Sequence, residues 1–202
     1  YLWVSTFLGL DKFSIKEKKV TESYLQYADG RLMAADKDGN TLVIGQKDFI
    51  SCYSPQTKLM QDIHTPGINT KHVKTLFTDR NNKFRLFTDD GKLKTIEPDF
   101  STMPATLNIQ EKALHTPDIL YACTEDYILY FVDKDKQLYE YNTIDDKKKF
   151  LSDLSDLIEQ YGPISQITFY HSEIYIGFSG SYLLPISHPE KAINLNIGIF
   201  CL

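Results

Sequence analysis

The sequence has no long hydrophobic run, and this absence excludes a membrane-spanning helix within its 202 residues. A helix needs about 20 consecutive apolar residues to cross a bilayer, and no stretch approaches that length. A signal peptide is missing too, and the chain begins at Tyr1 without an initiator methionine. We therefore expect a soluble segment of a longer protein, without membrane contact of its own.

An excess of basic residues is also missing. The 22 Lys and Arg residues are outnumbered by 27 Asp and Glu residues, for a net charge of −5. Proteins that bind nucleic acids neutralise phosphates with basic side chains, so this balance disfavours nucleic acid as a partner. The longest basic run is Lys147-Lys148-Lys149, which we interpret as a solvated loop.

Metal-ligand spacing is absent among the cysteines and histidines. Three cysteines, Cys52, Cys123 and Cys201, are odd in number and far apart, so we interpret them as thiols that pack as small hydrophobic groups. The five histidines have no spacing typical of a zinc site either; they are His64, His72, His115, His171 and His188. The sequence predicts no metal and no cofactor, and cysteine usage leaves the compartment open.

Aromatic residues are abundant, at 13% of the chain, with 13 Tyr and 12 Phe against one Trp. Aromatic and β-branched residues favour pleated sheets over helices, and 42% hydrophobic residues suffice for a real core. These values indicate an all-β fold.

The sequence contains a repeat of about 40 to 45 residues. The opening strand aligns with four weaker copies, which places Leu2 opposite Leu42, Phe84, Leu129 and Ile174. Steps of about 40 to 45 residues are typical of a β-propeller, in which each repeat forms one four-stranded antiparallel blade. We predict a single β-propeller segment over residues 1–202 with four to five blades, and repeats that begin near residues 1, 31, 73, 119 and 164.

The expected strands follow the same order in each repeat, and the first repeat enters in the middle. Alternating apolar residues and Asp- or Gly-bearing turns mark them. They are Leu2–Thr6, Leu10–Ser14 and Val20–Tyr27; Arg31–Ala35, Thr41–Gln46 and Phe49–Tyr53; Val73–Thr78, Phe84–Thr88, Lys92–Ile96 and a strand around Ala105–Ile109; Ile119–Thr124, Ile128–Val132 and Gln137–Asn142; and Ile164–Phe169, Ile174–Phe178 and Tyr182–Ile186. Asn194–Leu202 is either the outer strand of the last blade or the inner strand of a sixth.

One helix of about three turns is expected after the fourth repeat. Phe150, Leu154, Leu157, Ile158 and Tyr161 fall at helical spacing, and Gly162-Pro163 is a stop signal.

Three segments invite a chemical interpretation that a turn explains better. Asp36–Asn40 holds two Asp and an Asn around a Gly, but it lacks the 12-residue length of a calcium loop. Asp89-Asp90 precedes Gly91, as a tight turn requires, and Ser179-Gly180-Ser181 joins two strands with no helix after it. We therefore predict no catalytic residues.

The segment Leu2-Trp3-Val4-Ser5-Thr6, followed by Gly9-Leu10 and Phe13, resembles the two-component regulator propeller repeat. In that family the strand is typically Leu, Trp, a β-branched residue, Gly and Thr, followed by Gly-Leu and a Tyr or Phe. Ser5 stands where the family has glycine. The resemblance covers most of the chain as repeat architecture, but only this first copy is specific. The weaker copies are Leu42-Val43-Ile44-Gly45, Phe84–Thr88, Leu138-Tyr139-Glu140-Tyr141 and Ile174-Tyr175-Ile176-Gly177.

The resemblance implies a place in the extracytoplasmic sensor region of a hybrid two-component regulator of the Bacteroidetes type. Such a regulator is anchored in the inner membrane, reads breakdown products of complex glycans in the periplasm, and carries histidine kinase and DNA-binding modules that this chain lacks. The family's ring needs about seven blades, so we expect a partial ring. Its unpaired strand edges would attract other strands, and we expect self-association through them.

Three functions stay open. The first, which we favour, is a sensor segment that performs no chemistry and contacts an oligosaccharide or a neighbouring sensor domain. The second is a general protein-interaction propeller, and the third is a propeller enzyme that cleaves glycans. The ligand-binding residues are unknown from the sequence, because most tyrosines of such a sheet are core residues and the sequence does not show which ones are exposed. The tyrosines available to stack on a sugar ring are Tyr24, Tyr27, Tyr121, Tyr127, Tyr161 and Tyr170.

Overall fold

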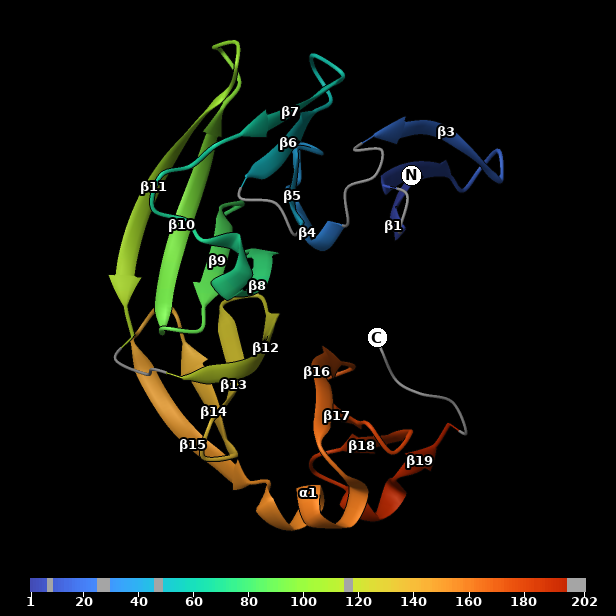
Figure 1. The fold of residues 1–202 in the computed structure, drawn as a ribbon, viewed down its shortest axis with the longest axis vertical. Helices are drawn as coiled ribbons and strands as arrows, with labels where there is room; N and C mark the ends of the chain where they lie inside the picture. The colour runs from blue at the N-terminus through green and yellow to red at the C-terminus, as the bar shows by residue number, and fades with distance from the viewer. Residues whose placement is uncertain (7–8, 25–29, 46–48, 115–117, 196–202) are drawn as a thin grey trace. The chain divides into compact units, whose positions relative to one another are not determined.

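The computed structural model describes residues 1–6, 9–24, 30–45, 49–114 and 118–195 (Figure 1). The chain divides into two compact units, each of which is described by itself. Unit 1 comprises Tyr1–Thr88 and Lys92–Lys112, and unit 2 comprises Asp89–Gly91 and Ala113–Leu202.

Unit 1 contains three antiparallel sheets in which strands adjacent in sequence are adjacent in space. Sheet 1 has three strands, and sheets 2 and 3 have four each. A 3-10 turn, Thr70–His72, precedes sheet 3. The strands are β1 (Leu2–Thr6), β2 (Gly9–Ser14) and β3 (Lys19–Tyr24); β4 (Gly30–Ala35), β5 (Thr41–Gly45), β6 (Ile50–Ser54) and β7 (Leu59–Ile63); and β8 (Val73–Thr78), β9 (Phe84–Thr88), β10 (Lys92–Asp99) and β11 (Thr106–Ala113).

Unit 2 contains two four-stranded sheets of the same order, separated by a helix. Sheet 4 precedes the helix α1 (Ser155–Tyr161), and sheet 5 follows it. The strands are β12 (Ile119–Glu125), β13 (Ile128–Asp133), β14 (Gln137–Asn142) and β15 (Lys147–Asp153); and β16 (Ile164–Tyr170), β17 (Glu173–Phe178), β18 (Tyr182–Pro185) and β19 (Ile193–Asn194), with a 3-10 turn at Pro189–Lys191.

The fold class is confirmed. The chain is all-β, its sheets are the antiparallel blades of a β-propeller, and one α-helix occurs among the described residues. The repeat positions Leu42, Phe84, Leu129 and Ile174 each lie in the second strand of a four-stranded sheet, and all are at most 5% exposed. The period of the sequence is therefore the period of the sheets.

Short Asp-bearing turns connect several of the strands. The Asp36 carboxylate accepts hydrogen bonds from the backbone N–H of Asp38 (3.0 Å) and of Asn40 (2.8 Å), while Gly39 adopts a φ of +82°. Such local bonds stabilise a tight hairpin, so the interpretation of this segment as a turn is confirmed.

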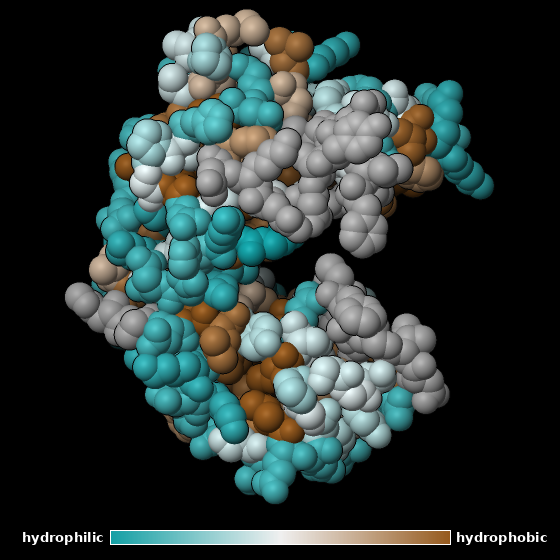
Figure 2. All heavy atoms as spheres, viewed as in Figure 1, coloured by the Kyte–Doolittle hydropathy of each residue, from teal (hydrophilic) through white to brown (hydrophobic). Residues whose placement is uncertain are grey.

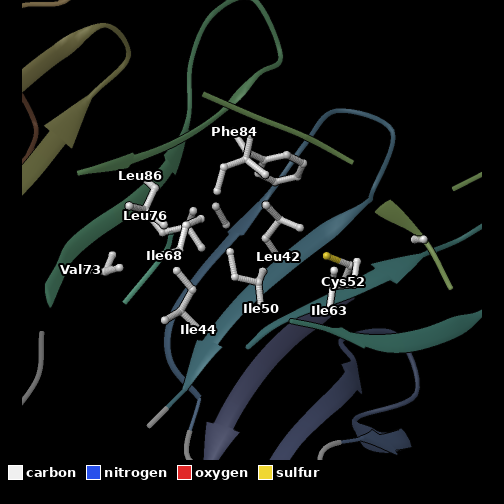
Figure 3. Packing of buried hydrophobic residues seen from close by; sticks show 13 residues of the cluster. Leu42, Ile44, Ile50, Cys52, Ile63, Ile68, Val73, Leu76, Phe84 and Leu86 are labelled. Carbon is white, nitrogen blue, oxygen red and sulfur yellow. The ribbon is translucent and has the colours of Figure 1, made fainter. Parts of the chain in front are cut away.

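Each unit has its own hydrophobic core between neighbouring sheets. In unit 1 the core lies between sheets 2 and 3 (Figure 3), where the fully buried Leu42, Ile44 and Ile50 meet Leu76, Phe84 and Leu86. In unit 2 Val132 and Leu138 of sheet 4 pack with Ile167, Ile176 and Phe178 of sheet 5. Two-sided packing of this kind is what makes the strands nearly continuous in apolar residues.

Hydrogen bonds hold neighbouring sheets together within each unit. Nη2 of Arg31 donates to the carbonyl groups of Thr70 (2.6 Å) and Val73 (3.0 Å), and the Thr78 hydroxyl donates to the carbonyl of Ala35 (2.9 Å). In unit 2 the Tyr121 hydroxyl donates to the carbonyl of Ile164 at 2.7 Å. These bonds fix the first strands of adjacent sheets side by side.

The predicted helix was wrong in its extent. Helix α1 covers seven residues, Ser155–Tyr161, and begins where the Asp153 carboxylate accepts a hydrogen bond from the Ser155 N–H (2.8 Å). Phe150 instead lies in β15, opposite Tyr139 of β14. Phe150 is 52% exposed on an outer strand, so burial does not select an apolar residue there. Its four-residue spacing from Leu154 is therefore a coincidence and does not indicate a helix.

The basic run Lys147-Lys148-Lys149 is also corrected, because it belongs to strand β15 and not to a loop. Its side chains are exposed on the outer strand of sheet 4, and hydrophilic residues cover this part of the molecule in Figure 2. Lysines on an outer strand discourage pairing with a foreign strand.

Two outer strands differ from their predicted bounds. β11 extends to Ala113, beyond the expected strand around Ala105–Ile109. Of the predicted strand Asn194–Leu202, the structure shows Ile193–Asn194 as the outer strand of sheet 5, and residues 196–202 lie outside the described residues.

Candidate functional site

A pocket of about 300 Å³ opens in unit 1, where two turns of sheets 2 and 3 meet the end of β10. The β4–β5 turn contributes one side and the β8–β9 turn another, and the chain after β10 completes the lining. The lining residues are Asp36, Asn40, Asn81, Asn82, Lys83, Phe84, Ile96, Glu97, Pro98 and Phe100. We call this the turn pocket.

The floor of the turn pocket is apolar. Phe84 and Ile96 lie opposite each other on β9 and β10, and both are fully buried. The ring of Phe100 is partly buried and packs against the same core. Phe84 and Ile96 therefore close the base of the pocket, and Phe100 is the aromatic side chain that a ligand could contact.

The rim on sheet 2 is held rigid by Asp36. Besides the two backbone N–H groups of its turn, the Asp36 carboxylate accepts a hydrogen bond from Nδ2 of Asn40 at 2.8 Å. Both of its oxygens are thus occupied within the turn, and the carboxylate positions Asn40.

The rim on sheet 3 is organised by the buried carboxylate of Asp79. It accepts hydrogen bonds from the N–H groups of Asn81 (2.9 Å) and Lys83 (3.0 Å), and it forms an ion pair with Arg85 at 2.8 Å. The Lys83 ammonium in turn pairs with the Glu97 carboxylate across the pocket rim. Buried charges need such partners, so this network fixes the turn.

Asn82 joins the two rims directly. Its Oδ1 accepts a hydrogen bond from the Lys37 N–H at 2.7 Å, and its Nδ2 donates to the Asp38 carboxylate at 3.3 Å. The neighbouring Asn81 differs, because within the part of the chain that the structure describes its side-chain amide has no hydrogen-bond partner. The amide of Asn81 is therefore available to a ligand.

This arrangement suits the binding of a small polar molecule. The lining contains amide and carboxylate groups above an aromatic floor, which is how pockets orient small polar molecules. Among the described residues that line it, there is no Ser, Cys or His.

A cluster of aromatic and charged side chains joins sheets 1 and 2 of unit 1. The ring of Trp3 lies 5.0 Å from that of Tyr53 and 5.7 Å from that of Tyr24, measured between centroids. Trp3 thus packs between sheets 1 and 2. We call this group, together with Lys12 and Glu22, the Lys12 cluster.

The Lys12 ammonium sits among these rings. Nζ lies 5.2 Å from the Tyr53 ring centroid and 5.9 Å from that of Trp3, and it donates to the Tyr53 hydroxyl (3.1 Å) and to Glu22 (3.0 Å). Burial alone lowers the pKa of Lys12, but the hydrogen bonds to Tyr53 and Glu22 outweigh it and raise the pKa overall. Hydrogen bonds from Tyr24 and then from Lys12 lower the pKa of Glu22. The cation is thus a structural link, held inside its own protein.

None of the described tyrosines considered for sugar stacking lines the turn pocket. Tyr24 belongs to the Lys12 cluster, Tyr121 bonds to Ile164, and Tyr161 packs against Phe178 and Tyr182. The carbonyl of Tyr127 accepts from Thr143, Tyr170 is 62% exposed at a hairpin tip, and Tyr27 lies outside the described residues. Phe100, which the sequence reasoning missed, supplies the aromatic ring of the pocket.

The histidines have separate surroundings. The rings of His64 and Phe49 lie 5.8 Å apart, those of His171 and Tyr170 lie 4.1 Å apart, and His188 faces Glu190 at 3.2 Å. Among the described residues no group of three His, Cys, Asp or Glu side chains could hold a metal ion. His72 lies in the 3-10 turn, and His115 falls outside the described residues.

The cysteines and the Ser-Gly-Ser segment lie away from the turn pocket. Burial raises the pKa of Cys52 and of Cys123 to about 12, which leaves both thiols protonated, and Cys201 lies outside the described residues. Ser179-Gly180-Ser181 joins β17 to β18, and Asp89-Asp90 forms the turn between β9 and β10.

Comparison with known proteins supports the fold and gives no family. No family model matches the chain, and no curated protein matches it. The extracellular domain of the putative one-component system BT4673 from B. thetaiotaomicron is similar in structure, with 12% identity and a TM-score of 0.61 over 92% of this chain and 25% of that chain. None of the described helices is long and apolar enough to span a membrane.

Two further solved structures share the fold. Virginiamycin B lyase from Staphylococcus aureus is 11% identical, with a TM-score of 0.63 over 91% of this chain and 61% of that chain. PorZ, a surface component of the type-IX secretion system of Porphyromonas gingivalis, is 10% identical, with a TM-score of 0.59 over 91% and 23%. The chain thus spans less than two thirds of each of these proteins, and at such identities the likeness shows the fold alone.

Proposed function

We propose that the chain is a ligand-sensing segment of a membrane-anchored regulator, which binds an oligosaccharide outside the cytoplasm, in the periplasm, and performs no chemistry on it. The parent protein would then carry the membrane span and the kinase or other output module. The structural likeness to the extracellular domain of a putative one-component system supports this setting.

The turn pocket is the observation that carries the proposal. Sugars present hydroxyl groups around an apolar ring face, and they are bound by amide and carboxylate groups beside an aromatic ring. Asn81, Glu97 and Phe100 offer this combination in one pocket. At about 300 Å³ the pocket is at the small end of the range for ligand sites, roughly 300–1,000 Å³, which suits one or two sugar rings.

Calorimetry with a panel of plant and host oligosaccharides tests the proposal. We expect saturable binding that falls at least tenfold in Asn81→Ala and in Phe100→Ala. Two matched controls, Asn108→Ala on the exposed outer strand β11 and Phe150→Ala on β15, should bind as the wild type does. Equal loss in the controls, or no binding by the wild type, would refute the turn pocket as a saccharide site.

Turnover is the outcome that would favour an enzyme. Two of the similar structures are of a lyase, so the same panel should be followed for product formation. Binding without product supports a sensor, whereas turnover that depends on Glu97 or Asp36 would replace it with a catalytic function. Binding to proteins only, with no saccharide bound, would favour a general interaction propeller.

A further inference from the structure

The turn pocket is lined by more negative than positive side chains, and its positive side chain is already paired. Its lining holds two carboxylates, Asp36 and Glu97, against one ammonium, Lys83. That ammonium is already paired with Glu97. The turn behind it adds Asp79, whose charge is matched by Arg85. No cation of the lining is left unpaired for an anionic ligand.

The cations near the pocket are committed or lie outside its lining. Arg85 donates from Nε to Asp79 at 2.8 Å and from Nη1 to the Thr95 hydroxyl, so its guanidinium is held within sheet 3. Lys37 meets Asn82 through its backbone N–H, and neither its side chain nor that of Arg80 lines the pocket. An anion would therefore enter beside carboxylates without a free positive partner.

The hydrogen-bonding groups of the lining favour donors on the ligand. Carboxylate and amide oxygens accept hydrogen bonds, and sugar hydroxyl groups can supply them. A carboxylate or sulfate on the ligand would instead repel Glu97 and Asp36, and it would lose its water without compensation.

We infer that the turn pocket selects uncharged saccharides and rejects acidic ones, such as uronic acids and sulfated sugars, through the paired state of Lys83. This inference rests on the proposed function, because it specifies the ligand class of the same site.

The test compares matched ligands on one protein. Calorimetry should use a glucose disaccharide and the corresponding disaccharide with a glucuronic acid in place of one glucose. We expect the neutral disaccharide to bind at least tenfold more tightly. The variant Glu97→Gln removes one carboxylate and frees the Lys83 ammonium, so it should raise the affinity for the acidic disaccharide at least tenfold.

A charge-matched control separates local from general electrostatics. Glu159→Gln removes an exposed carboxylate from α1 in unit 2, and it should leave both affinities unchanged. Equal affinity for both disaccharides would overturn the inferred selectivity. A Glu97→Gln variant with no gain in affinity for the acidic disaccharide would overturn it too. Both outcomes would leave the proposed function standing. Failure of both disaccharides and of the wider panel to bind would overturn the proposed function as well.

Discussion

Replacing Lys12 by Met should loosen the junction between sheets 1 and 2. The substitution keeps an unbranched side chain, one atom shorter, and removes its charge. It breaks the ion pair with Glu22, the hydrogen bond to Tyr53 and the cation–π contacts with Trp3 and Tyr53. Because the Lys12 side chain is only 14% exposed, water does not readily replace these partners.

The expected loss is about 2 kcal/mol in the free energy of unfolding of unit 1. The ion pair contributes about 0 to 1 kcal/mol, since Glu22 is 39% exposed and solvent screens it. A cation over aromatic rings contributes about 0.5 to 2 kcal/mol, and the hydrogen bond to Tyr53 about 1 kcal/mol. Apolar packing of the methionine offsets part of the sum.

Denaturant unfolding followed by tryptophan fluorescence measures this loss where it occurs. Trp3 is the one tryptophan of the chain and belongs to the Lys12 cluster. Lys19→Met is the matched control, because Lys19 pairs with Glu17 on the surface and both side chains are more than half exposed. It should change stability by less than about 0.5 kcal/mol.

The pH dependence gives a second measurement. The raised pKa of Lys12 adds stability that is present below about pH 10.5 and is lost above it. The lowered pKa of Glu22 adds stability that is present above about pH 4.5 and is lost as the pH falls. Lys12→Met should abolish the alkaline loss of stability that Lys12 causes, and it should reduce the acid loss only in part, because the hydrogen bond from Tyr24 also lowers the pKa of Glu22. A variant as stable as Lys19→Met, with unchanged pH limbs, would refute the role given to Lys12.

Three further predictions concern other parts of the chain. Gly180→Ala should destabilise unit 2 by about 1–3 kcal/mol, because an added Cβ would lie 2.7 Å from the carbonyl oxygen of Tyr161; thermal unfolding checks this against Ser179→Ala, which should cost less. The chain should self-associate through exposed strand edges, so sedimentation at rising concentration should show dimers or larger species, and a strict monomer would contradict this. Cys52, which is fully buried, should react with a thiol reagent only after denaturation in a variant that carries Cys123→Ser and Cys201→Ser, and fast reaction of the native protein would contradict its burial.

The sheets could be predicted from the sequence because each blade repeats one pattern. Four of the five aligned residues lie in the second strands of their sheets and are buried because sheets pack on both faces, whereas Leu2 of β1 is 53% exposed. The turns were recognisable from Asp and Gly, whose local hydrogen bonds are independent of the rest of the fold. The outer strands were predicted poorly, since one face and one edge meet solvent and little selects their residues. Lys147–Asp153 shows this, with a basic run and an exposed Phe150 in one strand.

The turn pocket could have been located in part from the repeat period. The turns at Asp36–Asn40 and at residues 79–83 occupy the same place in consecutive repeats, after the first strand of their sheets. Equal places in neighbouring blades lie side by side, so the period itself brings these turns together, as the bond from Lys37 to Asn82 shows. Phe100 was out of reach, because it follows β10 in the least patterned part of the chain. The polar rim of the pocket thus follows from the repeat, whereas its aromatic ring, Phe100, depends on a departure from the repeat.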